Sequence, residues 1–473
     1  MLLERAGNRH LCNRLSSGKQ QLSYMYSLRE GRPYGFLKNH INKIMSSVNT
    51  SAAEAVPSGE NVNFDPSTVK KLTFIELIKK VGPGIILTGI VIGPGAITTA
   101  SMIGAQYGYS LLWLYILIAF MGATYVLVTY RLSMLTGMPT IHAIRTYYGK
   151  GAAAFTGFAL FLTCCFFTIG NISGTGAGMN LVFGIDWKLG ATIMIGVLIY
   201  CYFSKGVYSK IEKGVGICVF GMIVAFYVTL IGTGGPNASA MVKGFTVWKF
   251  PEGSMATALG FLSTHAALTT GIYGTYLGKE KKWKKEDLFN GTLLADSIAH
   301  VVCVILISGA IMLVAAIVLN PTQTVVKSPA QLAEMLVPVM GNIARPIMGV
   351  ALLGAGFSSL LGNTQRGIVL LNAGFDKDTS LEAKSVRIGA FLVLAVSAAI
   401  CFLFGGSPVQ LIYIANLATA IATPVSGAFI VLMIWRKDTT AGYKAPTALR
   451  ICMTICYIVC LFLTAASLQK LIK

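Results

Sequence analysis

The stretch LTGIVIGPGAITTAS, residues 87–101, decides which fold the sequence predicts. With its flanks it is apolar and long enough to cross a bilayer. Pro94 cannot donate a backbone hydrogen bond, and the glycines on either side of it tolerate non-helical backbone angles. We therefore expect a membrane-spanning helix that is broken in mid-membrane.

A second apolar segment is interrupted in a similar way. It reads GFLSTHAALTTG, residues 260–271, and it lacks proline but is crowded with hydroxyls, small residues and a histidine. Hydroxyl side chains compete for backbone hydrogen bonds, so a break is expected here too. Broken first helices in two five-helix halves are the sequence sign of an inverted-repeat transporter, whose substrate sits where the helices unwind.

The composition places these segments in a membrane protein. Of the 473 residues, 54% are hydrophobic and only 12% are charged, whereas soluble chains carry about 25% charged residues. Apolar runs alternate with short polar loops, which predicts an all-α polytopic membrane protein of about eleven transmembrane helices. The expected spans are 82–104, 110–136, 154–184, 189–204, 214–233, 254–278, 289–319, 344–372, 386–404, 408–435 and 446–469.

We expect two parts. Residues 1–78 read as a basic, disordered cytoplasmic tail, and residues 79–473 as the transmembrane transporter domain. Within that domain, repeat one covers about 82–233 and repeat two about 254–435, followed by an extra helix at about 446–469.

The net charge of +20 reflects topology rather than nucleic-acid binding. Lys and Arg sit in the tail and in short loops, such as the run 279–285, and cytoplasmic loops carry this excess. The bias predicts a multi-pass protein of the plasma (inner) membrane with its N-terminus cytoplasmic and its C-terminus outside.

Several motifs resemble the Nramp family of divalent metal transporters. They are GPGA (93–96), GAQYGYSLLW (104–113), NLVFGI (180–185) and GFSS (356–359), and the resemblance runs from about Lys79 to Leu463. It implies a LeuT-type fold with 5+5 inverted repeats, helices 1 and 6 broken, and a substrate site at the breaks.

The family's ligands are missing at the matching positions. Gly93 and Ala96 stand where the family has the metal-binding Asp and Asn of its first helix. The Met-Pro-His of its sixth helix falls on residues 267–269, which read Ala-Leu-Thr. The third-helix acids of the proton route fall on Thr168 and Asn171, and the tenth-helix Gln on Ala422.

These losses leave two kinds of cargo open. Small side chains, hydroxyls and carbonyls suit a largely hydrated Mg²⁺ better than a dehydrated Mn²⁺ or Fe²⁺. Half-helix N-termini with hydroxyl donors, including Ser101, equally suit a small organic anion or amino acid. The expected substrate-binding residues are Gly93, Pro94, Gly95, Ala96, Thr98, Thr99, His265, Ala266, Ala267, Thr269 and Thr270, and no metal site with side-chain ligands is expected.

Three ionisable residues inside spans are candidates for proton transfer or gating. Asp296 and His300 lie one turn apart on the seventh span, where they form a candidate proton pair, although Asp296 also fits the cap of a neighbouring helix. Arg366 either attracts an anion toward the cytoplasmic vestibule, pairs with Asp296 or snorkels to the interface. Thr168 and Asn171 complete this group.

The sequence thus predicts a secondary transporter working by alternating access, with a Mg²⁺-like divalent cation as the first cargo. The alternatives are a transporter of a small organic anion or amino acid, and a transport-inactive membrane sensor. No catalytic constellation can be assembled, so we expect no enzyme and no cofactor. The expected partners are the bilayer and a small ion or solute, without nucleic acid or an obligatory protein partner.

Overall fold

The structure is a computed structural model that describes residues 68–472 except 204–206, 420–422, 437 and 441–444. The first half of this part consists of helices α4 (Phe74–Lys80), α5 (Pro83–Val91), α6 (Pro94–Tyr107), α7 (Leu114–Thr136), α8 (Thr140–Phe183), α9 (Trp187–Phe203), α10 (Val207–Gly232) and α11 (Ala238–Thr246). The second half consists of α12 (Ser254–His265), α13 (Leu268–Glu280), α14 (Lys285–Phe289), α15 (Thr292–Val318), α16 (Pro329–Glu334), α17 (Val337–Met340), α18 (Ala344–Gly374), α19 (Lys384–Leu403), α20 (Pro408–Thr419), α21 (Thr423–Trp435) and α22 (Thr447–Ile472). Most of the expected tail lies outside the described residues, but its last part includes α4.

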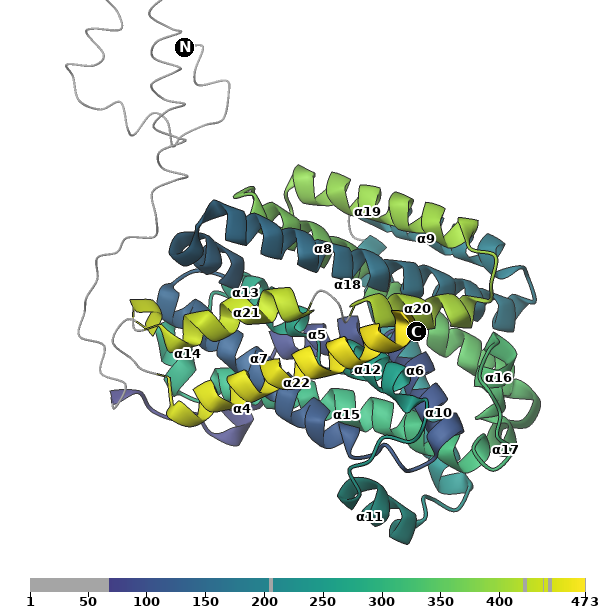
Figure 1. The fold of residues 1–473 in the computed structure, drawn as a ribbon. Helices are drawn as coiled ribbons and strands as arrows, with labels where there is room; N and C mark the ends of the chain where they lie inside the picture. Colours follow the sequence, from purple (N-terminus) through teal and green to yellow (C-terminus); the bar gives the residue numbers. More distant parts are fainter. Residues whose placement is uncertain (1–67, 204–206, 420–422, 437, 441–444, 473) are drawn as a thin grey trace, which may run out of the picture. The chain divides into compact units, whose positions relative to one another are not determined.

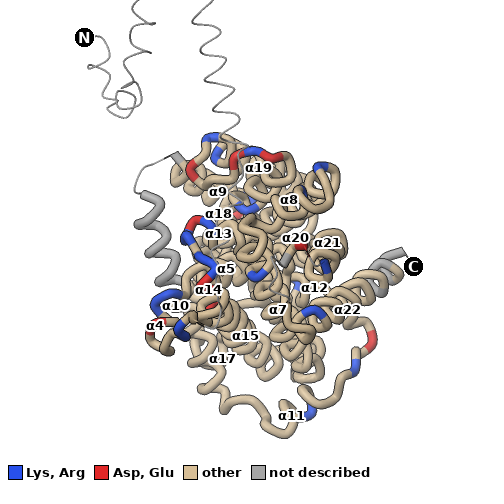
Figure 2. Tube along the Cα trace, turned by 90° about the vertical axis from the view of Figure 1, so that its left-hand side faces the viewer, with Lys and Arg blue, Asp and Glu red and all other residues tan. Residues whose placement is uncertain are grey.

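The predicted spans appear as helices. Six described helices are long and apolar enough to cross a membrane, and α5 with α6 forms one further span bent by 61°. The remaining spans are shorter apolar helices or pairs of helices: α9, α10, α12 with α13, and α20 with α21. Figure 2 shows that charged residues occupy few positions along the trace.

A separate helical segment precedes the third predicted span. Residues 140–148 are already helical, and the part of α8 after Gly149 corresponds to the predicted span 154–184. Gly149 interrupts this long helix with a φ of 90°, a left-handed value that favours glycine. The loops also contain short helices that the hydropathy pattern does not reveal, such as α11 and α16.

Helices α8 and α18, the third helix of each half, lie side by side through the bundle (Figure 1). Their backbones approach closely at glycines. A Cβ added to Gly157 would lie 2.7 Å from the carbonyl oxygen of Leu370, and one added to Gly178 would lie 2.7 Å from that of Gly349. Small residues at such crossings are how membrane helices pack without a hydrophobic drive between them.

The two halves pack in an equivalent way around the breaks. Helix α6, the second part of the first broken span, packs against α15, whereas α13, the second part of the other broken span, packs against α7. Helix α7 is the span after the first broken span, and α15 is the span after the second. Each broken span therefore packs against the second span of the other half, which is the pattern that an inverted repeat produces.

Candidate substrate site at the two helix breaks

The first break lies between α5 and α6. Ile92 (φ −79°, ψ 73°) and Gly93 (φ −108°, ψ −174°) leave the helical conformation before Pro94 starts α6. In an unbroken helix the carbonyl of Ile90 would accept a hydrogen bond from the backbone of residue 94, which proline cannot give. Ser359 of α18 supplies it instead, because its hydroxyl donates to that oxygen at 2.9 Å.

The neighbouring carbonyl is satisfied in the same way. The N–H of Gly93 donates to Val91 rather than to Gly89. The hydroxyl of Ser358 donates to the Gly89 oxygen at 3.1 Å. The two serines of α18 therefore replace the backbone hydrogen bonds that the carbonyls of Gly89 and Ile90 lose at the break.

The second break contains no proline. Ala266 (φ −124°, ψ 47°) and Ala267 (φ −73°, ψ 124°) separate α12 from α13. It is tied to α20, because the hydroxyl of Ser263 donates to the carbonyl of Asn416 at 3.0 Å and lies 3.2 Å from the hydroxyl of Thr419.

The two breaks close on one small cavity. Its volume is about 10 Å³, room for about one water molecule, so the space between the breaks is too small in this structure for a larger solute. Four segments line the cavity: the first break, α8, the second break and α18. The lining residues are Ile90, Val91, Gly93, Gly95, Ala96, Phe167, Asn171, Thr264, Ala267, Thr270, Asn363 and Arg366.

Seven of the residues predicted from the sequence line this cavity and the others do not. Those in the lining are Gly93, Gly95, Ala96, Asn171, Ala267, Thr270 and Arg366. Outside it, the hydroxyls of Thr99, Ser101 and Thr168 donate to carbonyls of their own helices, at 2.8, 2.6 and 2.8 Å. Pro94, Thr98, Ala266 and Thr269 are also buried near the breaks without lining the cavity.

His265 lies at the end of α12, beside the cavity lining. Its Nδ1 donates to the carbonyl of Phe261 at 2.8 Å, and its ring packs on the Phe261 ring at 4.2 Å. The Nε2 atom is buried and has no hydrogen-bond partner in the part of the chain that the structure describes. One ring nitrogen thus orients the imidazole while the other stays available.

Asp296 and His300 lie away from the cavity and fasten α5 to α15. The carboxylate of Asp296 accepts hydrogen bonds from the N–H groups of Gly82 (2.9 Å) and Gly84 (2.8 Å) and from the hydroxyl of Tyr130 (3.1 Å). Nδ1 of His300 lies 2.9 Å from the hydroxyl of Thr88. Asp296 therefore caps the N-terminus of α5. This geometry matches the second role predicted for it, the cap of a neighbouring helix.

Arg366 lies in the cavity, and among the described residues no ion pair joins it to Asp296. The residue is only 2% exposed and lies in the second half of α18. One terminal nitrogen donates to the amide oxygen of Asn363, and its guanidinium carbon lies 5.5 Å from the Phe167 ring centre. The expectation that it pairs with Asp296 is not met, because Asp296 accepts its hydrogen bonds at the N-terminus of α5.

Several site residues could not be read from the sequence. Asn363 and Phe167 complete the lining, and the amide of Asn416 lies so close to Gly95 that an added Cβ there would be 2.6 Å from its oxygen. An amide inside the apolar run of α20 was a usable signal for Asn416. The sequence prediction placed the tenth-helix residue at Ala422 instead, outside the described residues.

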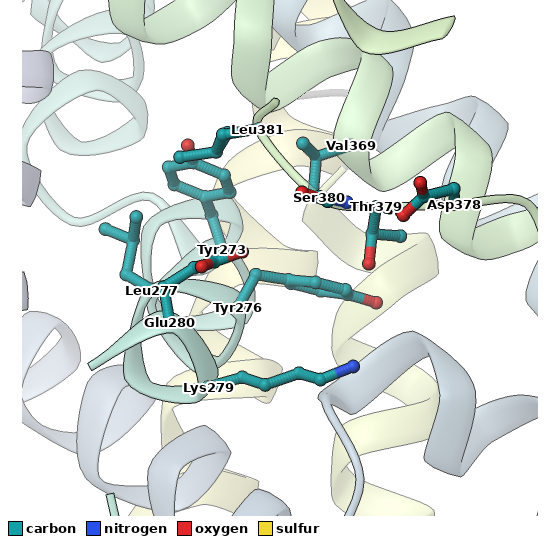
Figure 3. Close-up of a pocket in the computed structure, with 10 residues that line it drawn as sticks. All are labelled: Tyr273, Tyr276, Leu277, Lys279, Glu280, Val369, Asp378, Thr379, Ser380 and Leu381. Atoms are coloured by element: carbon teal, nitrogen blue, oxygen red, sulfur yellow. Dashed lines mark hydrogen bonds between the residues drawn. The ribbon is translucent and has the colours of Figure 1, made fainter. Parts of the chain in front are cut away.

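A larger hollow, of about 160 Å³, lies at the end of the bundle that carries the lysine-rich loop 279–285. Residues of α13, such as Tyr276, line one side, and Val369 of α18 with residues 378–381 line the other (Figure 3). It shares no lining residue with the cavity at the breaks. Among the described residues, no group of three or more His, Cys, Asp or Glu could hold a metal ion.

Comparison with solved structures defines the class of protein. The manganese transporter of Eremococcus coleocola superimposes with a TM-score of 0.61 at 15% identity, covering 85% of this chain and 90% of that one. MhsT, solved in complex with L-phenylalanine, gives a TM-score of 0.55 at 16% identity and covers 84% of this chain and 99% of its own. The fold is thus that of the LeuT-type membrane transporters, with two inverted five-helix repeats.

Sequence comparison then defines the family. The profile of the Nramp family (natural resistance-associated macrophage protein-like) matches residues 84–470. A divalent metal cation transporter MntH from Agrobacterium fabrum is 28% identical over 321 residues, 64% of this chain and 68% of its own length. A protein of the same name from Brucella suis is 24% identical over 378 residues, covering 77% and 82%. This chain belongs to the Nramp family and is a multi-pass membrane protein.

Proposed function

We propose that this chain is a secondary transporter that works by alternating access and carries a divalent cation through the cavity between the two helix breaks. The observation that carries the proposal is that both broken spans meet at one small cavity lined by both halves. Relatives named as divalent metal cation transporters support this cargo. We place the chain in the plasma (inner) membrane with the lysine-rich loop on the cytoplasmic side.

The lining chemistry supports a hydrated, Mg²⁺-like ion over Mn²⁺ or Fe²⁺. It contains no carboxylate, thiol or thioether among its described residues, and apart from the guanidinium group of Arg366 its polar groups are carbonyls, hydroxyls and amides. Transition metals prefer softer nitrogen and sulfur ligands, whereas Mg²⁺ keeps several waters when it binds. The cavity must open to admit such an ion, because its volume in this structure is about 10 Å³.

The charge of Arg366 restricts how a cation can enter. At about 6 Å and an effective dielectric constant of about 20, a single positive charge repels a divalent ion by roughly 5 kcal/mol. A bare ion has no carboxylate in the lining to offset this repulsion. Retained hydration water, or an anion that enters with the ion, would reduce it.

The direct test is influx into proteoliposomes of the purified full chain, with trapped dyes for Mg²⁺ and Mn²⁺, with and without a pH gradient. We expect Mg²⁺ influx without preference for Mn²⁺. Gly95→Ala should slow it because the new methyl group meets Asn416, whereas Gly309→Ala, with nothing within 4 Å, is the matched control. Absence of flux for both ions in tight vesicles contradicts the cation proposal, and a membrane sensor without transport activity would be silent for every solute tested.

A second test addresses the positions directly. Gly93→Asp with Ala96→Asn and Ala267→Met introduces a charged and a soft ligand. An added Cβ at Gly93 would lie 2.9 Å from the Cβ of Ser359, so Ser359→Gly belongs in the same variant. Calorimetry should detect a gain of Mn²⁺ binding over the Ser359→Gly variant alone. Equal affinity in both would mean that these positions do not contact the ion.

A further inference from the structure

We propose that the cavity at the helix breaks binds a small carboxylate, or another oxyanion of similar size, through the guanidinium group of Arg366. This inference rests on the proposed function in one respect, because it takes the cavity to be the transport site. The anion is either the cargo itself or a counter-ion that enters with a divalent cation. The same contacts with Arg366 would hold it in both cases.

The first argument is an uncompensated buried charge. Arg366 is 2% exposed, and a guanidinium group stays protonated in proteins. Its Nε and one terminal nitrogen are buried, and apart from the weak acceptor sulfur of Cys164 beside the guanidinium group they have no hydrogen-bond partner among the described residues. Its described neighbours are neutral: the amide of Asn363, the ring of Phe167 and the thiol of Cys164. A buried charge without a partner is costly, so a ligand that supplies the opposite charge is favoured.

The second argument is that no carboxylate of the described chain is available to Arg366. Only two acids are buried in that part of the chain, Asp287 and Asp296. Asp296 caps α5, and Asp287 is paired with Lys80 at 3.1 Å. The missing negative charge must therefore come from outside the described part of the chain.

The third argument is the set of donors around Arg366. The Nδ2 atom of Asn171 and the hydroxyl of Thr270 line the same cavity and are buried without partners among the described residues. Gly95 and Ala96 also line it, in the first turn of α6, where backbone N–H groups have no partner within the helix. A guanidinium fork, an amide, a hydroxyl and a helix N-terminus together are the groups that bind carboxylates.

The size of the cavity limits the ligand. Room for about one water in this structure means that the anion enters only when the helices move apart. A carboxylate of a few carbon atoms requires the smallest opening. We therefore choose acetate, lactate and glycine as probes, the last because it carries the carboxylate on an amino acid.

The test is calorimetric titration of the full chain in lipid nanodiscs with each probe, with and without Mg²⁺. We expect at least one probe to bind. Arg366→Gln should weaken it by roughly tenfold or more, because a charge-assisted bidentate pair is lost. Arg345→Gln removes an exposed arginine from the start of the same helix and should leave binding unchanged. Binding without Mg²⁺ would identify the anion as cargo, whereas binding only with Mg²⁺ would identify it as a counter-ion.

Asn363→Asp is a second variant that separates loss of anion binding from a folding defect in Arg366→Gln. It places a carboxylate at a position that already bonds to Arg366, so it should abolish anion binding without lowering the thermal stability of the unliganded protein. The proposal is overturned if no probe binds the unaltered chain, or if binding survives both Arg366→Gln and Asn363→Asp. Mg²⁺ influx that persists while no anion binds would refute this inference alone and leave the proposed transport function standing.

Discussion

Both helix breaks interrupt a membrane span, but different residues produce them. The first is built from Pro94 and its flanking glycines, and its free carbonyls are satisfied by serines of α18. The second is built from two alanines and is tied to α20 through Ser263. A break imposed by proline is a property of the local sequence, whereas a break without proline depends on its neighbours to remain open.

The segments before the breaks differ as well. The start of α5 is capped by Asp296 of α15, Thr88 further along α5 bonds to His300, and α4 before it is held by the Lys80–Asp287 ion pair. Six of the nine residues of α5 are also buried. Helix α12 is buried along most of its length. Both segments are therefore largely buried, and the polar contacts with Asp296 and His300 are what distinguish α5.

The largest expected effect comes from the cap of α5. Asp296→Asn removes one of the two oxygens that accept the N–H groups of Gly82 and Gly84, and should cost roughly 2–3 kcal/mol. Thermal unfolding of the purified protein measures this loss. Glu334→Gln, at an exposed position of α16, is the control, and an equal shift in both variants would contradict the role of the cap.

The next effect tests the geometry of the first break. The Cβ of Gly93→Ala would lie 2.5 Å from the Ser359 hydroxyl, so it should destabilise the protein by about 1–3 kcal/mol. The reciprocal change Ala267→Gly at the second break should cost about 1 kcal/mol, because glycine loses more backbone entropy on folding and a buried methyl group is removed. Melting curves of the two variants, with Gly309→Ala as control, measure the two losses. A larger loss for Ala267→Gly than for Gly93→Ala would contradict the comparison.

A smaller difference is expected between the two serines. Ser359→Ala leaves the Ile90 carbonyl without its donor, a loss of about 1–2 kcal/mol. Ser263→Ala should cost about 0.5 kcal/mol, because Thr419 also donates to the Asn416 carbonyl, at 2.7 Å. Chemical denaturation of the two variants side by side measures the difference, and equal losses would mean that the breaks are held equally.

The smallest effect is pH-dependent and lies outside the membrane. Burial raises the pKa of Asp287, but hydrogen bonds from the backbone of Lys284, from Asn290 and from Lys80 outweigh it and leave the pKa below its usual value. A lowered carboxyl pKa stabilises the folded state above the unfolded pKa, and this stability is lost as the pH falls through the folded pKa. We expect a loss of under about 1 kcal/mol below pH of about 4, because Lys80 is half exposed.

The control for this prediction is Asp287→Asn. It should flatten the acidic limb of the stability curve. Added salt should also lower the contribution of the Lys80–Asp287 ion pair to stability at neutral pH. An unchanged acidic limb in the variant would show that other carboxylates govern it.

Much of the fold could be predicted from residue patterns. Apolar runs predict the spans because every backbone group in lipid must be bonded within its own helix. Pro94 predicts the first break because the missing N–H is a property of that residue. The second break was inferred from hydroxyls and small residues alone, and the structure places it at Ala266 and Ala267.

The candidate site was predicted less completely, for a physical reason. Gly93, Gly95 and Ala96 are near the first break in sequence, so they could be named. Asn171, Asn363 and Arg366 reach the cavity from two other helices, and their meeting depends on how α8 crosses α18. The sequence could also not decide whether Arg366 faces the cavity, pairs with an acid or reaches the interface.

The sequence by itself determined that this is a polytopic helical membrane protein with a proline-broken first span, because both features follow from local composition. Only the tertiary structure decided that the cavity is small, that Asp296 is engaged at the start of α5, and that Arg366 lies buried without an acidic partner among the described residues. Charge balance in a buried site depends on which side chains distant parts of the chain bring together, and local patterns carry no record of that.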